Sequence, residues 1–332
     1  MLNQSHNESG SSDLKKLPLA VLLGTRYPII MAPMFLVSNE EMIISAFKAG
    51  ISAAIPALNY RTEIELRFGI RRLKEGSVGS FGINLIVNKS NLRYPAQLKV
   101  CCEEHVNFII TSLGSPLATI KEAKNSGIKV FCDVTDIEHA KKVEQLGADA
   151  IIAVNNRAGG HAGNLSPEDL IVKLKSSCSI PIISAGGVGC GSEMKKLVSL
   201  GADGFSIGSI FIASTESGVS EEYKRACVDY GARDIVMTTK LSGTPCTVIN
   251  TPYVQKIGTQ QTWIERVLNK NKRLKKWFKA FTFYKGIKSL EKAAFSATYK
   301  NVWCAGPSIE HVKEILPVEE IVRKLIDKYN EA

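Results

Sequence analysis

From Pro28 to Ala213 the chain repeats one pattern of apolar and polar positions. Each repeat has a short apolar run, a turn, an amphipathic stretch and usually a glycine before the next run. The apolar runs are continuous rather than alternating, which is typical of parallel strands covered on both faces. Eight segments are therefore predicted to be strands: Pro28–Met34, Ile51–Ala54, Gly79–Leu85, Phe108–Thr111, Lys129–Asp133, Ala150–Val154, Pro181–Ala185 and Gly204–Ile207.

The amphipathic stretches between these runs predict helices. In Ile137–Leu146 the apolar side chains fall on one side and the charged ones on the other, and Gly147 ends the helix. Eight strands alternating with helices predict an α/β fold, the TIM (β/α)₈ barrel. An open doubly wound sheet has the same repeat. It would place Gly-x-Gly-x-x-Gly after the first strand, which here ends in Ala32-Pro33-Met34.

Composition agrees with a globular protein. The chain is 45% hydrophobic, its mean hydropathy is close to zero, and no apolar run approaches the roughly 20 residues of a membrane-spanning helix. The eight cysteines show neither metal-ligand nor disulfide spacing, and Met1–Asp13 is polar without the features of a signal peptide. We expect a cytoplasmic protein with no transmembrane segment and no metal site.

The net charge of +10 is concentrated in one segment. Between Gln261 and Lys300 there are eleven Lys or Arg residues against two acidic ones, so this segment alone carries +9. Because the charge is local, we expect no nucleic-acid partner. Two interpretations of the segment stay open. It is a lid helix whose cationic face receives an acidic substrate, or Asn269–Phe281 is a helix that binds a membrane surface or a polyanion.

The repeat ends after residue 214. Lys240–Asn250 is β-like, a basic helical stretch follows, and Pro317–Tyr329 predicts a terminal amphipathic helix. We therefore divide the chain into four parts: a disordered tail (1–13), a barrel (14–257), a basic helical lid packed on the barrel rim (258–300) and a segment that returns to the barrel (301–332).

In such a barrel the working residues lie in loops at the C-terminal strand ends. The first strand ends in Ala32-Pro33-Met34, whose flat apolar face suits the isoalloxazine ring of a flavin, although a proline also simply ends a strand. Asn84 ends the third strand among apolar neighbours, so its amide needs a partner, either the flavin edge or a loop. After the fifth strand we expect Asp136 to cap a helix, which leaves Asp133 as the site candidate.

The loop after the sixth strand carries a histidine among glycines. Gly159, Gly160 and Gly163 let the backbone approach a ligand and direct the imidazole of His161 inward. Histidine titrates near neutral pH, so it can donate or accept a proton beside a bound flavin. A structural hydrogen bond is the other interpretation, but the position at a strand end favours a catalytic role.

Glycine turns follow the seventh and eighth strands, at Gly186-Gly187 and at Gly208-Ser209. In barrel enzymes these two positions commonly hold a phosphate through backbone N–H groups near helix N-termini. The two turns therefore predict a phosphate-bearing ligand, and FMN fits the apolar face after the first strand.

The same residues carry a resemblance to a known family. The chain resembles the nitronate monooxygenases, formerly called 2-nitropropane dioxygenases, and the related flavin-dependent enoyl-acyl-carrier-protein reductases. The resemblance runs from about Pro28 to Ser217 and resumes near Trp303–Val322. It depends on five motifs: Met31-Ala32-Pro33-Met34, Gly82-Ile83-Asn84, Ala158-Gly159-Gly160-His161-x-Gly163, Ser184-Ala185-Gly186-Gly187 and Ile207-Gly208-Ser209.

The resemblance implies an FMN-binding TIM barrel with His161 as the catalytic residue and Asn84 against the flavin. It also implies that the two glycine turns bind the FMN phosphate and that a helical lid precedes the terminal segment. Three motifs depart from the family: Arg157 stands where Glu is usual, Val154-Asn155-Asn156 lacks the usual Gln, and Ala305-Gly306-Pro307 replaces Ala-Gly-Gln. These departures concern the substrate side of the site.

Two activities follow from the resemblance. In the first, FMN and O₂ oxidise a small alkyl nitronate to a carbonyl compound and nitrite. In the second, NAD(P)H reduces the flavin, which then reduces an enoyl thioester or a quinone. The expected partners are therefore a small-molecule substrate with O₂ or NAD(P)H. Assembly as a homodimer is compatible with such a barrel.

Overall fold

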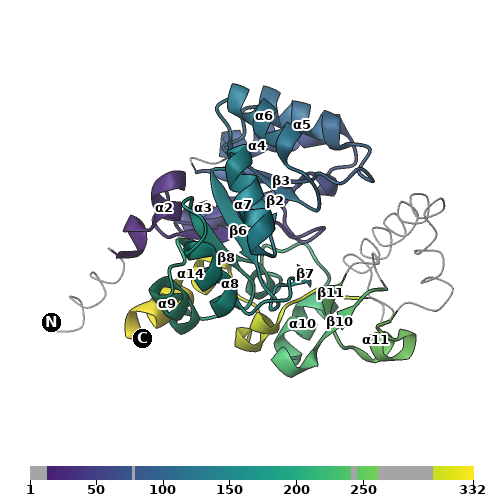
Figure 1. Cartoon of the computed structure of the whole chain (residues 1–332). Helices are drawn as coiled ribbons and strands as arrows, with labels where there is room; N and C mark the ends of the chain where they lie inside the picture. The colour runs from purple at the N-terminus through teal and green to yellow at the C-terminus, as the bar shows by residue number, and fades with distance from the viewer. Residues whose placement is uncertain (1–12, 77–78, 241–244, 261–301) are drawn as a thin grey trace.

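The computed structural model describes residues 13–76, 79–240, 245–260 and 302–332. Eight parallel strands form a closed barrel, in which the last strand pairs with the first (Figure 1). The predicted barrel is therefore confirmed, and each predicted strand segment contains one strand with ends shifted by at most a few residues. The strands are β1 (Ile29–Met31), β2 (Ser52–Pro56), β3 (Phe81–Ile86), β4 (Phe108–Ser112), β5 (Lys129–Val134), β6 (Ala150–Val154), β8 (Ile182–Ala185) and β9 (Gly204–Ile207).

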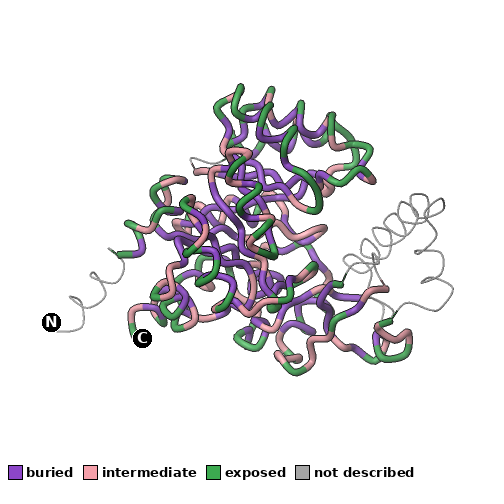
Figure 2. The backbone as a smooth tube through the Cα atoms, viewed as in Figure 1, coloured by how far each residue is buried: buried purple, intermediate pink, exposed green. Residues whose placement is uncertain are grey.

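Helices cover the outside of the barrel. Buried residues therefore lie mainly in its centre, and exposed residues lie mainly on the surrounding helices (Figure 2). Helix α7 has the predicted bounds because Asp136 accepts a hydrogen bond from the His139 N–H at 2.8 Å and Gly147 takes a φ of 91°. The terminal helix α14 packs between α9 and α3 and completes the ring. The helices are α3 (Glu40–Lys48), α4 (Glu63–Gly76), α5 (Tyr94–Glu103), α6 (Leu117–Asn125), α7 (Ile137–Leu146), α8 (Pro167–Lys175), α9 (Gly191–Ser199) and α14 (Val318–Glu331).

The N-terminal end of the barrel is closed by helix α2 (Pro18–Leu23). Leu19 and Leu23 join the apolar cluster inside the barrel, where the rings of Phe108 and Phe131 stack with centroids 4.9 Å apart. The contact is close, because a Cβ added at Gly204 would lie 2.4 Å from the Leu19 side chain. Helix α2 therefore plugs the N-terminal end of the barrel, so a cavity can open only at the C-terminal ends of the strands.

Replacing Leu19 with Ala is expected to lower the free energy of unfolding by about 2–5 kcal/mol, because Leu19 is fully buried and the site cannot collapse around the lost atoms. Urea unfolding measures the change. Val21→Ala in the same helix is the control, since Val21 is 69% exposed and should change stability by less than about 0.5 kcal/mol. Equal losses in the two variants would contradict the plug.

A second, three-stranded antiparallel sheet lies beside the barrel mouth in the order β10-β11-β7 (Figure 1). The sequence predicted β-structure in Lys240–Asn250, where β11 lies, but not β7 or β10. The elements outside the barrel and its ring of helices are β7 (Gly160–His161), β10 (Ile235–Thr238), β11 (Cys246–Ile249), α10 (Glu221–Asp229), α11 (Pro252–Ile257) and the short 3₁₀ helices η1 (Ala57–Asn59), η2 (Ser209–Phe211), η3 (Ala232–Asp234) and η4 (Pro307–His311).

Two of the predicted parts fall largely outside the described residues. These are the tail of residues 1–13, apart from Asp13, and the lid of residues 258–300, apart from residues 258–260. The predicted terminal helix is confirmed as α14. Within the described ranges, no helix combines the length and the apolar character needed to cross a membrane.

Candidate active site

A cavity of about 650 Å³ opens at the C-terminal ends of the barrel strands. Its volume is within the range of small-molecule sites, roughly 300–1,000 Å³. The structure brings every predicted site residue to this one cavity, although they come from six different strand ends. They are Ala32, Pro33, Met34, Asn84, Asp133, Gly159, Gly160, His161, Gly186, Gly187, Gly208 and Ser209.

One wall is the apolar segment after β1. The Ala32 N–H donates to the Ile207 carbonyl at 2.8 Å, which continues the barrel pairing past the strand ends. The Met34 N–H donates to the Ser38 hydroxyl at 2.8 Å, and this bond fixes the turn that follows. A Cβ at Gly208 would lie 3.4 Å from both Ala32 and Met34, so the eighth-strand turn lies directly beside this apolar wall.

A hydrogen-bonded chain links three strand ends on the cavity floor. The Asn84 amide nitrogen donates to the Ser112 hydroxyl at 2.7 Å and to the Ile110 carbonyl at 3.3 Å. The Ser112 hydroxyl donates in turn to the Asp133 carboxylate. The amide orientation is thereby fixed, and within the described chain no donor reaches the Asn84 Oδ1. Ser112 was not predicted as a site residue, although it is a polar residue directly after the fourth predicted strand.

Asp133 is the titrating member of this chain. Burial raises its pKa to about 6, and the hydrogen bond from Ser112 opposes that rise. Near neutral pH the carboxylate is therefore mostly ionised and accepts the Ser112 hydroxyl. Below about pH 6 it takes up a proton, and the direction of that hydrogen bond is then free to reverse.

Asp133→Asn is expected to remove a pH dependence of stability. The raised pKa means that the folded protein binds more protons than the unfolded chain between the ordinary value of 3.8 and about 6. Wild-type stability therefore falls as the pH rises through this window, by roughly 3 kcal/mol for a shift of this size. Urea unfolding of both proteins from about pH 4 to about pH 7 measures the difference. Parallel stability curves would rule out a buried, titrating Asp133.

The loop after β6 is fixed to the loop after β8 by Asn155, which is fully buried. Its side-chain amide donates to the Gly186 carbonyl at 2.9 Å, and its Oδ1 accepts the Arg157 N–H at 2.8 Å. Gly186 has a φ of 111°, and a Cβ there would lie 2.5 Å from the Ala158 nitrogen. Only glycine therefore allows these two loops to approach so closely.

His161 is held at the cavity mouth by residues that are distant in sequence. In β7 it pairs with Cys246 of β11, and the neighbouring Thr247 hydroxyl donates to the Ala158 carbonyl at 2.7 Å. The imidazole reaches solvent, yet the surrounding wall removes enough water to lower the pKa of His161 below its ordinary value of 6.5. The ring is therefore mainly neutral at neutral pH. Cys246 and Thr247 were not predicted as site residues, because no local pattern marks their pairing with this loop.

The glycine turns supply backbone donors to the cavity. Within the described ranges, the N–H groups of Gly187, Val188, Gly208 and Ser209 donate to no protein acceptor. The two N–H groups just before α9 differ, because Gly189 and the N-cap residue Cys190 donate to the Glu193 carboxylate at 2.7 and 3.1 Å. The donors available to an anion in the cavity therefore belong to the turns themselves, because no residue of α9 lines it.

The segment that begins at Val302 closes the cavity from the side. The Gly306 N–H donates to the Ser209 hydroxyl at 2.8 Å, and a Cβ at Gly306 would lie 2.9 Å from the Gly159 nitrogen. Tyr223 fixes the same segment, because its ring stacks on Trp303 and its hydroxyl donates to the Cys304 carbonyl at 2.6 Å. The cavity is thus assembled from both halves of the chain.

Comparison with known proteins identifies the family to which this chain belongs. A family model described as nitronate monooxygenase matches residues 90–328, well over half of the chain. The chain belongs to the nitronate monooxygenase family. The predicted resemblance is therefore confirmed, and the C-terminal part of the chain, beyond the barrel strands, belongs to the match.

The chain is also similar to two curated proteins and to one solved structure. Nitronate monooxygenase from Paraburkholderia phytofirmans is 29% identical over 69% of this chain and 75% of that protein. A (3aS,4S,5R,7aS)-5-hydroxy-7a-methyl-1-oxo-octahydro-1H-indene-4-carboxyl-CoA dehydrogenase from Rhodococcus jostii is 27% identical over 80% of this chain and 73% of that protein. The structure of FabK from Thermotoga maritima superposes with a TM-score of 0.83 at 29% identity, over 95% of this chain and 96% of that one. The protein is a flavin-dependent oxidoreductase.

Proposed function

We propose that the protein binds FMN in this cavity and uses O₂ to oxidise small alkyl nitronates to a carbonyl compound and nitrite. The observation that carries the proposal is His161, held at the mouth of a cavity in a chain of the nitronate monooxygenase family. The same cavity offers an apolar wall on one side and backbone N–H donors on the other.

The residues present fit FMN. Ala32-Pro33-Met34 gives the flat apolar surface that an isoalloxazine ring requires, and Asn84 offers its Oδ1 to a donor on the ring edge. The N–H groups of Gly187 and Gly208, with no protein acceptor in the described chain, suit a phosphate. When bound, the flavin would supply the electron transfer between substrate and O₂.

His161 is proposed as the residue that meets the reacting carbon of the substrate. Its lowered pKa keeps the imidazole neutral at neutral pH, so one ring nitrogen accepts a proton and the other donates a hydrogen bond. Thr247 and Cys246 hold the loop through β11, which keeps the ring at the cavity mouth. The loop thus positions an imidazole whose lowered pKa leaves it unprotonated, and so able to accept a proton, at neutral pH.

Arg157 is proposed to add a cationic contact to the phosphate. It lines the cavity, its aliphatic stem packs against Gly187, and its guanidinium lies 3.9 Å from Glu168. This position is the one at which the family usually has Glu, so a positive charge here changes the field beside the glycine turn. The charge favours an anionic group of the cofactor or the substrate.

Replacing Arg157 with Met is expected to weaken FMN binding by up to about fivefold, because a half-exposed charge contributes roughly 0–1 kcal/mol. Flavin fluorescence on dilution of the holoprotein measures the dissociation constant. Arg233→Met, at an exposed position in η3, is the control. A fivefold effect that persists unchanged at high salt would argue for lost packing instead of lost charge.

The central experiment is simple. The purified protein should be yellow, or become yellow on reconstitution with FMN, and should release nitrite from propionate-3-nitronate or ethylnitronate in the presence of O₂. A colourless protein that cannot be reconstituted would remove the proposal. A yellow protein that releases no nitrite would support the proposed cofactor and contradict the proposed substrate.

A second candidate is supported by the coenzyme A thioester named for the relative from Rhodococcus jostii. In this activity NAD(P)H reduces the flavin, and the protein then reduces an enoyl thioester or a quinone with His161 as the proton donor. The positive charge of residues 261–300 would suit an acidic thioester carrier. Addition of NADH or NADPH without oxygen decides: rapid bleaching of the flavin favours the reductase, and an unchanged spectrum favours the monooxygenase.

The basic segment also remains part of this proposal as a lid over the barrel rim. Sedimentation with anionic vesicles or with nucleic acid, at low and high salt, tests the alternative of a surface-binding helix. Co-sedimentation that is lost at high salt would favour that alternative. If the protein sediments with neither vesicles nor nucleic acid, the surface-binding helix is rejected and the lid is retained as the proposal.

A further inference from the structure

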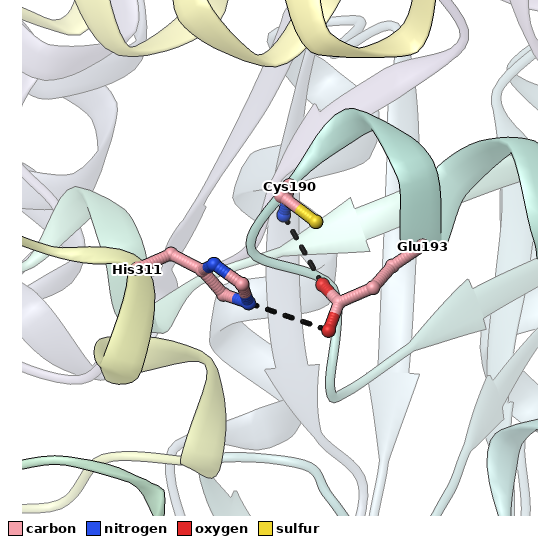
Figure 3. A group of neighbouring side chains, drawn as sticks. All are labelled: Cys190, Glu193 and His311. Atoms are coloured by element: carbon pink, nitrogen blue, oxygen red, sulfur yellow. Dashed lines mark hydrogen bonds and ion pairs between the residues drawn. The ribbon is translucent and has the colours of Figure 1, made fainter. Parts of the chain in front are cut away.

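Three potential metal ligands meet outside the cavity, at the start of α9 (Figure 3). The sulfur of Cys190, a carboxylate oxygen of Glu193 and a ring nitrogen of His311 all lie within 4.8 Å of one another. His311 Nε2 is 3.3 Å from Glu193 Oε1. Within the described ranges no other group of three such side chains comes so close together.

The backbone of two segments brings these side chains together. Glu193 reaches back to the Gly189 and Cys190 N–H groups with Oε2, which leaves Oε1 turned to His311 (Figure 3). His311 ends η4, and a Cβ at Gly189 would lie only 2.4 Å from its ring. The cluster is therefore set by close packing of the α9 start against η4, rather than by loose surface side chains.

We propose that Cys190, Glu193 and His311 bind one zinc-type divalent ion. A thiolate, an imidazole and a carboxylate are the donors that zinc takes in proteins, and three protein ligands leave a fourth position for water. His311 is exposed and the other two side chains are half-buried, so an ion and its water can enter from solvent. In this structure Glu193 pairs with His311, and the sulfur of the N-cap residue Cys190 lies 3.0 Å from the Ser192 hydroxyl. A bound ion would instead bring all three donors to one centre.

The ion would act as a clamp behind the cavity wall. Val188 and Ser308 line the cavity, and they precede Cys190 and His311 by two and three residues. One ion would therefore tie the loop after β8 to the segment that closes the cavity. No metal site was expected from the sequence, because Cys190 and His311 are far apart in the chain and show no ligand spacing. This inference does not depend on the proposed nitronate activity.

Alkylation of the wild-type protein gives the first test, and it requires no variant. Zn²⁺ should slow iodoacetamide labelling of Cys190 by at least about tenfold, because a metal-bound thiolate is no longer a free nucleophile. Cys102 is also half-buried and lies outside the cluster, so its labelling rate is the internal control. Peptide mass spectrometry reads both sites. Equal labelling of Cys190 with and without Zn²⁺ would overturn the proposal.

Co²⁺ gives the second test through difference spectra against the holoprotein without added metal, because its d–d bands lie beyond the flavin absorption but its thiolate charge-transfer band overlaps it. We expect about one Co²⁺ per chain with a band from thiolate ligation. Cys190→Ser and His311→Asn should each weaken binding by more than the roughly 10- to 100-fold typical of outer-shell changes. Cys102→Ser and His105→Asn are the matched controls. Co²⁺ that binds without a thiolate band, or equally well to Cys190→Ser, would show an unrelated surface site and refute the assignment.

Discussion

Replacing His161 with Gln is expected to lower kcat/KM for nitronate oxidation by about 10²- to 10⁴-fold while the flavin stays bound. The imidazole is a titratable group at the cavity mouth, and its lowered pKa leaves it able to accept a proton at neutral pH. Glutamine keeps a hydrogen-bonding side chain of similar length but cannot act as a base. Nitrite release measures the rate, and the flavin spectrum confirms that the site is occupied.

The pH profile separates a catalytic role from a structural one. If neutral His161 is the base, wild-type activity should fall as the pH drops through its pKa, which lies below 6.5, and this limb should be absent from the Gln variant. His105→Asn is the control, because His105 is exposed, lies outside the cavity and has a φ of 46° that Asn tolerates. An unchanged kcat/KM in His161→Gln would move the chemistry to another residue.

Gly186→Ala is expected to weaken FMN binding by about 5- to 150-fold, because the new Cβ forces roughly 1–3 kcal/mol of strain into the site. At a φ of 111° the Cβ would lie 2.5 Å from the Ala158 nitrogen and 2.6 Å from the Asn155 Oδ1. The loops after β6 and β8 must separate to relieve this contact. The N–H groups proposed to hold the phosphate then move with them. Flavin content after dialysis and titration of the apoprotein with FMN measure the loss.

Gly127→Ala is the matched control for Gly186. It places a side chain in the same disfavoured half of backbone space, with a φ of 70°, but no atom lies within 4 Å of the new Cβ. It should cost about 1 kcal/mol of stability and leave the FMN affinity unchanged. If the two variants lose flavin equally, general destabilisation would explain the effect and the close approach of the loops would not.

The sequence by itself determined the barrel. The strands of a parallel barrel are buried on both faces, so they appear as continuous apolar runs, and all eight could be located. Local signals also fixed helix ends such as Asp136 and Gly147, whose hydrogen bonds involve only their neighbours. Because the C-terminal ends of parallel strands meet at one mouth, the same count predicted that Asn84, His161 and Gly187 would share a cavity.

Only the tertiary structure decided how those residues are held. Ser112 links Asn84 to Asp133 across three strands, and β11 fixes His161 from a segment far along the chain. Cys190 and His311 likewise meet only because α9 packs against η4. Such contacts join residues that are distant in sequence. They therefore leave no periodic signal in the chain and depend on the folded positions of several elements at once.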